Sequence, residues 1–290
     1  MSSRLIINAD DFGLTPGINR AIAELHDAGA VTSATLMANG PAFDDAVALA
    51  LARPTLGIGC HIVLVDGTPV SDPASIPTLL GPDHKTFHNS LASFALGVLR
   101  GAITQDDIQR EVLSQIQKLQ RAGLKLTHAD THKHTHLLSR VTRPILRALD
   151  QSGIHAIRNP FEPRWAASVG GSARRSLFVH AFEPGRRRFL ASPPIASHGI
   201  RTTGGTIGMS ATGHLNSATL NSLLRKMTSG TWELVCHPGY NDRDLDAVTT
   251  RLRAHRETEL RALLTTFGKS SSNPLNPSGI QLIHYGELET

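Results

Sequence analysis

The residues best suited to chemistry in this chain of 290 residues are gathered in one short segment, Asp-Thr-His-Lys-His-Thr-His at 130–136. In an extended segment alternate side chains face the same way, so we expect Asp130, His132, His134 and His136 to share one face. Each of these groups needs a polar partner when buried, which makes the set a poor filling for a hydrophobic core. Their chemistry is that of a metal site or an acid–base site.

Residues of the same kind occur near the ends of other expected strands. Asp10 and Asp11 end the first strand, His61 lies in the third, and His237 ends a later one. Taken alone, an Asp pair before a turn fits helix capping equally well, and a lone histidine at a strand end is more often structural. Because all of these residues lie near expected strands of one sheet, we interpret them together as one candidate site.

Together these groups can form a hydrolytic site. One carboxylate with His61 and His132 makes a facial set of ligands that leaves positions open on a divalent ion. Such an ion lowers the pKa of a bound water and polarises a carbonyl oxygen. A second carboxylate can take the proton from that water, and His237 is placed to protonate a leaving group or stabilise an oxyanion.

The elements that must position these groups alternate as strand and helix about six or seven times. This alternation predicts a parallel sheet with helices outside it, and sites in such sheets form at the carboxyl ends of the strands. Residues 66–94 and 269–279 are expected to be loops, and 159–213 is irregular. We expect strands near residues 5–7, 31–37, 56–64, 125–130, 154–158, 231–236 and 280–284, and helices near 15–29, 43–52, 104–122, 140–151, 218–227 and 245–264.

Composition excludes several classes of function. Apolar residues make up 40% and charged residues 18% of the chain, which is typical of a globular protein. The net charge is +5, but only 4% of residues are aromatic, so we expect no nucleic-acid partner. The chain has no apolar run that could span a bilayer and no signal-like start, which predicts a cytoplasmic protein.

The arginine clusters and the cysteines are interpreted as structural. Arg174 with Arg175, and the three arginines at 186–188, are taken as solvated loop charges. The alternative is an anionic ligand or a peripheral membrane contact. Cys60 and Cys236 form no disulfide framework and are expected to be small buried residues.

Four motifs, in their order along nearly the whole chain, resemble the YdjC-like family. They are Ala-Asp-Asp-Phe-Gly at 9–13, Gly-Cys-His-Ile-Val-Leu at 59–64, the histidine-rich segment at 130–136 and His-Pro-Gly-Tyr at 237–240. That family includes chitooligosaccharide deacetylases and deacetylases of hopanoid biosynthesis. The residues at 63–67 and 132–134 resemble the hopanoid-associated branch more closely.

The resemblance implies an irregular (β/α) barrel of six or seven mainly parallel strands, formed by one domain over residues 1–290. It also implies that the protein removes N-acetyl groups from an amino sugar in an oligosaccharide or a glycolipid such as an N-acetylglucosaminyl hopanoid. A homodimer is expected only from this resemblance. Residues 164–212 match no motif, so substrate choice is expected to lie there.

The resemblance also assigns roles residue by residue. Asp11, His61 and His132 would bind one divalent ion, with zinc favoured over magnesium because magnesium prefers more oxygen ligands. Asp10 would be the general base and His237 the general acid. The remaining residues of the segment would orient a neighbour, reach the substrate or pack beneath the site: Asp130, His134 and His136.

Two other functions stay open at this point. One is a metal-dependent hydrolase that acts on another amide or on a phosphate ester. The other is a non-catalytic protein that binds a metal or a sugar. Asp10 and His237 argue against binding alone, because binding requires neither a base nor an acid.

Overall fold

The sheet that positions the site is built from seven short strands. The computed structural model describes residues 3–169, 183–248, 250–269 and 279–288, and within these ranges the strands pair in parallel. The strands are β1 (Ser3–Phe12), β2 (Ser33–Leu36), β3 (Gly57–Ile62), β4 (Leu126–Thr131), β5 (Thr206–Ile207), β6 (Gly230–Cys236) and β7 (Ile280–Leu282).

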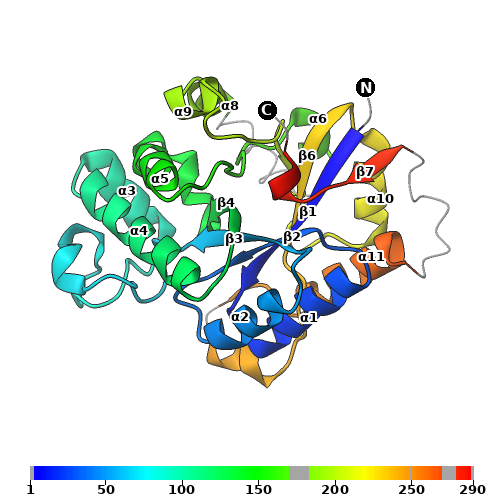
Figure 1. Ribbon diagram of the computed structural model, residues 1–290, viewed down its shortest axis with the longest axis horizontal. Helices are drawn as coiled ribbons and strands as arrows, with labels where there is room; N and C mark the ends of the chain where they lie inside the picture. Colours follow the sequence, from blue (N-terminus) through cyan, green and yellow to red (C-terminus); the bar gives the residue numbers. More distant parts are fainter. Residues whose placement is uncertain (1–2, 170–182, 249, 270–278, 289–290) are drawn as a thin grey trace.

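The strand order is β4-β3-β2-β1-β6-β5, and β7 also pairs with β1. β1 is central because β6 covers one of its edges, while β7 and β2 share the other. Two isolated parallel bridges, Ala129 with Ile157 and Ala156 with Arg201, continue the sheet beyond β4. The sheet therefore curls into a half-barrel, which confirms the predicted irregular parallel barrel (Figure 1).

Helices cover the outside of the curled sheet. In Figure 1, α3, α4 and α5 lie together on one side of the sheet, and α1, α2 and α11 lie together on another. The longer helices are α1 (Pro16–Asp27), α2 (Phe43–Leu51), α3 (Leu91–Arg100), α4 (Gln105–Arg121), α5 (Ser139–Gln151), α8 (Glu183–Leu190), α10 (Ser217–Lys226) and α11 (Ala254–Phe267). Single turns form α6 (Arg164–Ala167) and α9 (Pro193–Ala196).

Local sequence explains where two of the main helices begin. The Thr15 hydroxyl accepts a hydrogen bond from the Ile18 amide, and Thr104 does the same for Asp107, which satisfies free donors in the first turn. Four apolar residues of α4 recur at helical spacing and are buried where the helix packs against β3. They are Ile108, Val112, Ile116 and Leu119.

Three predictions about the elements were wrong. The loop expected to reach residue 94 ends earlier, because Ser90 caps α3 with its side chain. The helix expected from residue 245 starts at Ala254, after a 3-10 turn η4 (Arg243–Ala247). The strand expected at 154–158 is reduced to the two isolated bridges.

Several smaller predictions concern single residues. Cys60 and Cys236 are free and buried, as predicted. Arg174 and Arg175, and most of the loop predicted at 269–279, lie outside the described residues. Among the described helices, none has the length and apolar character needed to cross a membrane.

Candidate metal and catalytic site

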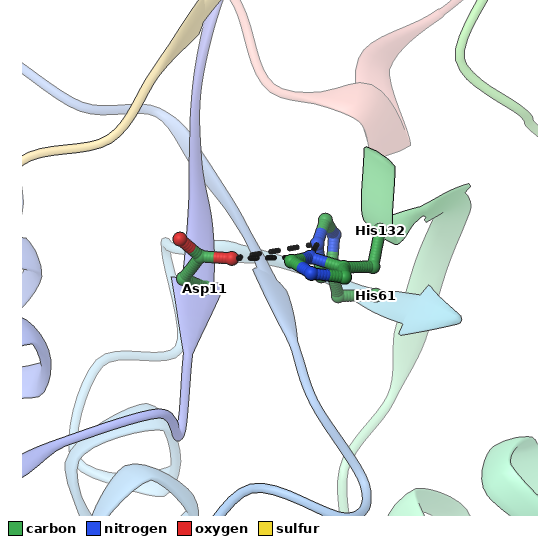
Figure 2. Close-up of side chains that lie close together, drawn as sticks. All are labelled: Asp11, His61 and His132. Atoms are coloured by element: carbon green, nitrogen blue, oxygen red, sulfur yellow. Dashed lines mark hydrogen bonds and ion pairs between the residues drawn. The ribbon is translucent and has the colours of Figure 1, made fainter. Parts of the chain in front are cut away.

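Three side chains from separate elements converge on one point. Asp11 extends from β1, His61 from β3, and His132 from the turn that follows β4 (Figure 2). The Asp11 Oδ1 atom lies 3.6 Å from His61 Nε2 and 3.6 Å from His132 Nδ1, and the two nitrogens are 3.3 Å apart. The three atoms form a nearly equilateral triangle of metal-ligand type.

The distances between these three atoms can be compared with the separations between ligand atoms around zinc and magnesium. Zinc binds histidine and carboxylate at about 2.0–2.2 Å in a tetrahedron, which separates its ligand atoms by about 3.3–3.6 Å. Octahedral magnesium, with bonds of about 2.1 Å, separates neighbouring ligands by only about 3.0 Å. The observed separations of 3.3 Å and 3.6 Å therefore fit a tetrahedral ion.

An irregularity in β1 brings two consecutive aspartates to the same place. The pairing register of β1 with β2 shifts between Ala9 and Phe12, and Asp11 has a positive φ of 65°. Consecutive residues of a regular strand point to opposite faces, whereas here Asp10 and Asp11 both line one cavity. Aspartate tolerates this left-handed conformation better than most residues, which suits it to the position.

Asp10 is held by a guanidinium that also binds two other carboxylates. Arg158 Nη1 and Nη2 donate to the two Asp10 oxygens over 2.8 Å and 2.7 Å. The same fork contacts Asp130 Oδ2 at 2.5 Å and Glu233 Oε1 at 2.6 Å. Burial alone would raise the pKa of Asp10, but the charge and hydrogen bonds of Arg158 outweigh it and lower this pKa strongly. Asp10 is therefore ionised.

Asp130 links this network to the metal-ligand triangle. Its Oδ1 lies 2.8 Å from His61 Nδ1, which leaves His61 Nε2 facing Asp11 and His132. Burial works to lower the pKa of His61, but Asp130 and the other nearby carboxylates raise it to about 9. The carboxylate fixes the orientation of the ring, as is common for histidines that bind metals.

A second group of ligand type, formed by Asp10, His61 and Asp130, is a poorer choice for an ion. The guanidinium of Arg158 already bonds to both of its carboxylates. The Asp11 triangle does not have this obstacle, because Arg256 Nη2 occupies only Oδ2 of Asp11, at 2.6 Å. Burial would raise the pKa of Asp11, but the charge of Arg256 outweighs this effect and holds the pKa well below its usual value.

The buried charges around the triangle do not balance. Among the described residues, the four buried carboxylates of Asp10, Asp11, Asp130 and Glu233 face two buried guanidiniums, those of Arg158 and Arg256. When no ion is bound, His61 adds one positive charge, because its pKa is about 9. With His61 neutral, as a metal ligand must be, and all four carboxylates ionised, the cluster carries two excess negative charges. A buried charge that lacks a counter-charge is costly, so the donor set and its charge both fit one divalent cation.

His237 approaches Asp10 from the end of β6. Its Nε2 lies 3.7 Å from Asp10 Oδ2, and its backbone amide donates to Glu259 Oε2 over 2.6 Å. Its Nδ1 is buried and has no hydrogen-bond partner among the described residues. The ring thus presents Nε2 to the same space that Asp10 faces.

The histidine-rich segment does not have the extended form that was predicted. β4 ends at Thr131 and a 3-10 segment, η3 (His132–Leu137), follows, with positive φ at Lys133 and His134. This turn directs His132 and His134 into one cavity, while His136 lines a different one. The four residues therefore do not share one face, because the strand that would alternate them has already ended.

The site opens on a cavity of about 700 Å³. The side chains of Asp10, Asp11, His61, His132 and His237 all line it. Its rim is formed by the beginning of α3 and by segments that precede α10 and α11: Asn89, Ser90, Leu91, Ala92, Met209, Ser210, Thr250, Arg251 and Leu252.

Three charged residues of the site were not recognised in the sequence. Arg158 is the last residue of an expected strand, so the rule that sites form at the carboxyl ends of strands could have indicated it. Glu233 stands inside an apolar strand and is fully buried, which by itself requires a partner. Arg256 lies in a charged helix with no distinguishing pattern.

Comparison with known proteins places the chain among relatives of one kind. Two proteins named carbohydrate deacetylase are 33% identical over 248 residues, from Homo sapiens, and 37% identical over 249 residues, from Listeria monocytogenes. These alignments cover 82% and 85% of this chain and 75% and 86% of the two relatives. A Brevibacillus brevis protein of the same name is 40% identical over 148 residues, which is 51% of this chain and 56% of that protein.

A solved structure and a family profile complete the comparison. A structure from Enterococcus faecalis, whose name proposes cellobiose-phosphate cleavage, covers 100% of both chains with a TM-score of 0.78 and 22% identity. At that identity it shows the fold alone. Residues 4–267 match the profile of the family described as YdjC-like protein. Since the match spans most of its length, this chain belongs to the YdjC-like protein family.

Proposed function

We propose that this protein is a metal-dependent hydrolase that removes N-acetyl groups from an amino sugar. The observation that carries the proposal is the Asp11–His61–His132 triangle, which opens on the same cavity as Asp10 and His237. The relatives named carbohydrate deacetylase support the choice of a sugar amide over other substrates.

The metal would be held by Asp11 Oδ1, His61 Nε2 and His132 Nδ1, with zinc favoured over magnesium by the ligand types and separations. A divalent ion bound there would lower the pKa of a water molecule and polarise the acetyl carbonyl. Asp130 would keep His61 in the orientation that this requires.

Asp10 and His237 would share the proton transfers. The carboxylate of Asp10 takes a proton from the attacking water, and Nε2 of His237 gives one to the departing amine. The 3.7 Å between Asp10 Oδ2 and His237 Nε2 lets both reach atoms of a single reacting centre. Arg158 fixes the direction of the carboxylate but weakens it as a base, since it lowers the pKa of Asp10.

The cavity sets a limit on the substrate. Its volume of about 700 Å³ lies within the range of about 300–1,000 Å³ that is usual for small-molecule sites. The substrate would therefore place one or two sugar rings in the cavity, with the rest of an oligosaccharide or the lipid of a glycolipid outside it.

Acetate release tests the proposal. The wild-type protein should release acetate from N-acetylglucosamine, its short oligomers or an N-acetylglucosaminyl glycolipid, and a chelator should abolish this activity until zinc or magnesium is restored. Asp10→Asn should lower kcat by about 10²–10⁴-fold while the bound metal is retained. Asp106→Asn, an exposed aspartate on α4, is the matched control and should have wild-type activity.

Two results would contradict the proposal in different ways. If Asp10→Asn releases acetate as fast as the wild type, the role given to Asp10 is wrong. If the metal-loaded protein hydrolyses a phosphodiester and none of the acetylated sugars, the site is hydrolytic but the substrate class is wrong.

A further inference from the structure

A second cavity, of about 780 Å³, lies beside the catalytic one. The two share parts of the chain: η3 gives His132 and His134 to the catalytic cavity and His136 to the second. Helix α3 likewise begins at the catalytic rim with Leu91 and reaches the second cavity with Leu99. None of the catalytic or metal-binding roles proposed above uses the second cavity.

The lining of the second cavity is apolar on the inside. Val98, Leu146, Phe161 and Phe189 are buried side chains that line it, and they come from α3, α5, the segment before α6, and α8. Such a surface favours an aliphatic or other apolar body. The volume is again within the range of about 300–1,000 Å³ that is usual for small-molecule sites.

One buried polar atom in this lining lacks a partner. His136 is 1% exposed, and its Nε2 has no hydrogen-bond partner among the described residues. Its Nδ1 lies 2.6 Å from the Thr131 hydroxyl, and that oxygen also accepts from the His136 backbone amide. The hydroxyl can donate to Nδ1 or accept from it, so either ring nitrogen of His136 can carry the hydrogen. Nε2 is thus a buried polar atom with which a ligand can form a hydrogen bond.

Four arginines surround the same cavity, and no aspartate or glutamate lines it among the described residues. Arg140 donates to the carbonyls of Val98 and Leu99, and Arg147 donates to the Gln109 side chain, so both keep an unneutralised charge. The remaining two, Arg143 and Arg188, are exposed, and no carboxylate of the described residues pairs with either one. Guanidiniums arranged in this way attract phosphate or carboxylate groups.

We propose that the second cavity is a binding site for an anionic amphiphile, a molecule with an apolar chain and a phosphate monoester or carboxylate group. The chain packs on the apolar lining, and the anionic group binds the guanidiniums of Arg143 and Arg188. Nε2 of His136 gives the ligand a hydrogen-bonding partner within the apolar lining. The ligand would contact η3, the segment that also presents His132 to the catalytic cavity.

Calorimetric titration with octyl phosphate, below its micelle concentration, tests this site without any need for turnover. The wild-type protein should bind about one equivalent, and inorganic phosphate and octyl glucoside should each bind at least tenfold more weakly, because each lacks one half of the ligand. The paired variant Arg143→Gln/Arg188→Gln should weaken octyl phosphate binding about tenfold or more, as expected for loss of charge-assisted hydrogen bonds.

Arg187→Gln is the matched control. Arg187 is an exposed arginine of α8 next to Arg188, but it does not line the cavity, so this variant should bind octyl phosphate within twofold of the wild type. Equal affinity of the paired variant and the wild type would overturn the proposal. Octyl glucoside binding as tightly as octyl phosphate would overturn the anionic part of it, and inorganic phosphate binding as tightly would overturn the apolar part.

Discussion

Arg158 is the residue on which the buried network depends most. It is fully buried, and its one guanidinium contacts Asp10, Asp130 and Glu233. Replacement of Arg158 by glutamine would leave three buried carboxylates without their counter-charge. We expect this change to lower the free energy of unfolding by about 3–5 kcal/mol, measured by urea denaturation with chelator present.

The control for this prediction is Arg225→Gln, because Arg225 is exposed on α10 and donates to the Ser222 hydroxyl rather than to a carboxylate. It should change the free energy of unfolding by no more than about 0.5 kcal/mol. Equal stability of the Arg158 and Arg225 variants would mean that the three carboxylates do not need the guanidinium.

His128 gives a prediction about pH. It is buried, stacks on Tyr285 at 3.8 Å between ring centroids, and contacts Asn8 Oδ1 at 3.0 Å. Burial, followed by the charge of Arg158, lowers its pKa well below the usual 6.5. Below pH 6.5, His128 therefore binds a proton in the unfolded chain but not in the folded chain. The free energy of unfolding falls as the pH falls.

The effect of His128 should be as large as about 1.4 kcal/mol per pH unit between pH 6 and pH 5. His128→Gln should remove that part of the slope, even though it also lowers stability at every pH by losing the ring stack. Urea denaturation at several pH values, with chelator present throughout, measures the slope. An unchanged slope in the variant would mean that folded His128 takes up a proton in this range.

At the scale of elements, α4 fixes the chain that follows β3. Gln115 on α4 accepts from the Val63 amide over 2.9 Å and donates to the Val63 carbonyl over 2.7 Å. Glu111, one turn earlier, accepts from the amides of Val70 and Ser71. Two buried side chains of one helix thus hold the loop that leaves the strand of His61.

Gln115→Leu should therefore destabilise the protein although it adds an apolar side chain to a buried position. It leaves a buried N–H and a buried C=O without partners, which costs about 1–3 kcal/mol each. We expect a loss of at least about 2 kcal/mol in urea denaturation. Gln117→Leu, at an exposed position of the same helix, is the control and should be nearly neutral. A neutral Gln115 variant would show that the loop is held by other contacts.

The sequence could predict which strands and residues form the site better than it could predict the local backbone geometry there. The alternation of strands and helices, with polar residues at strand ends, was enough to bring Asp10, Asp11, His61 and His237 together. The form of η3 could not be predicted, because it depends on a left-handed backbone at Lys133 and His134, which short-range propensities disfavour. Arg256 could not be found either, since only the tertiary fold brings α11 to Asp11.

Gly59 shows how closely β3 packs against the buried side chains that surround Asp10. A Cβ atom on Gly59 of β3 would lie 2.6 Å from two ring atoms of His128, which is too close for any side chain. His128 in turn contacts Asn8, whose amide donates to Asp10 Oδ1 over 3.0 Å. The identity of residue 59 thus affects the position of the proposed base through two intermediate side chains.

At the scale of the whole molecule, the buried charge excess makes stability depend on the bound ion. Around the Asp11 triangle, four buried carboxylates face two guanidiniums once His61 is neutral, as it must be to bind the ion. An ion that binds only the folded chain stabilises it by about 2.7 kcal/mol when its free concentration is 100 times Kd. We therefore expect zinc to raise Tm of the chelated protein in a concentration-dependent way.

His132→Gln is the most informative variant for this prediction, because His132 is the most exposed of the three proposed ligands, at 22% of its side chain. In chelator its Tm should lie close to that of the wild type, since Asp11 keeps its partner Arg256. With zinc, the wild-type Tm should rise, and the variant should need at least tenfold more zinc for the same shift. If both proteins respond to zinc alike, or the wild type does not respond, the triangle does not hold the ion.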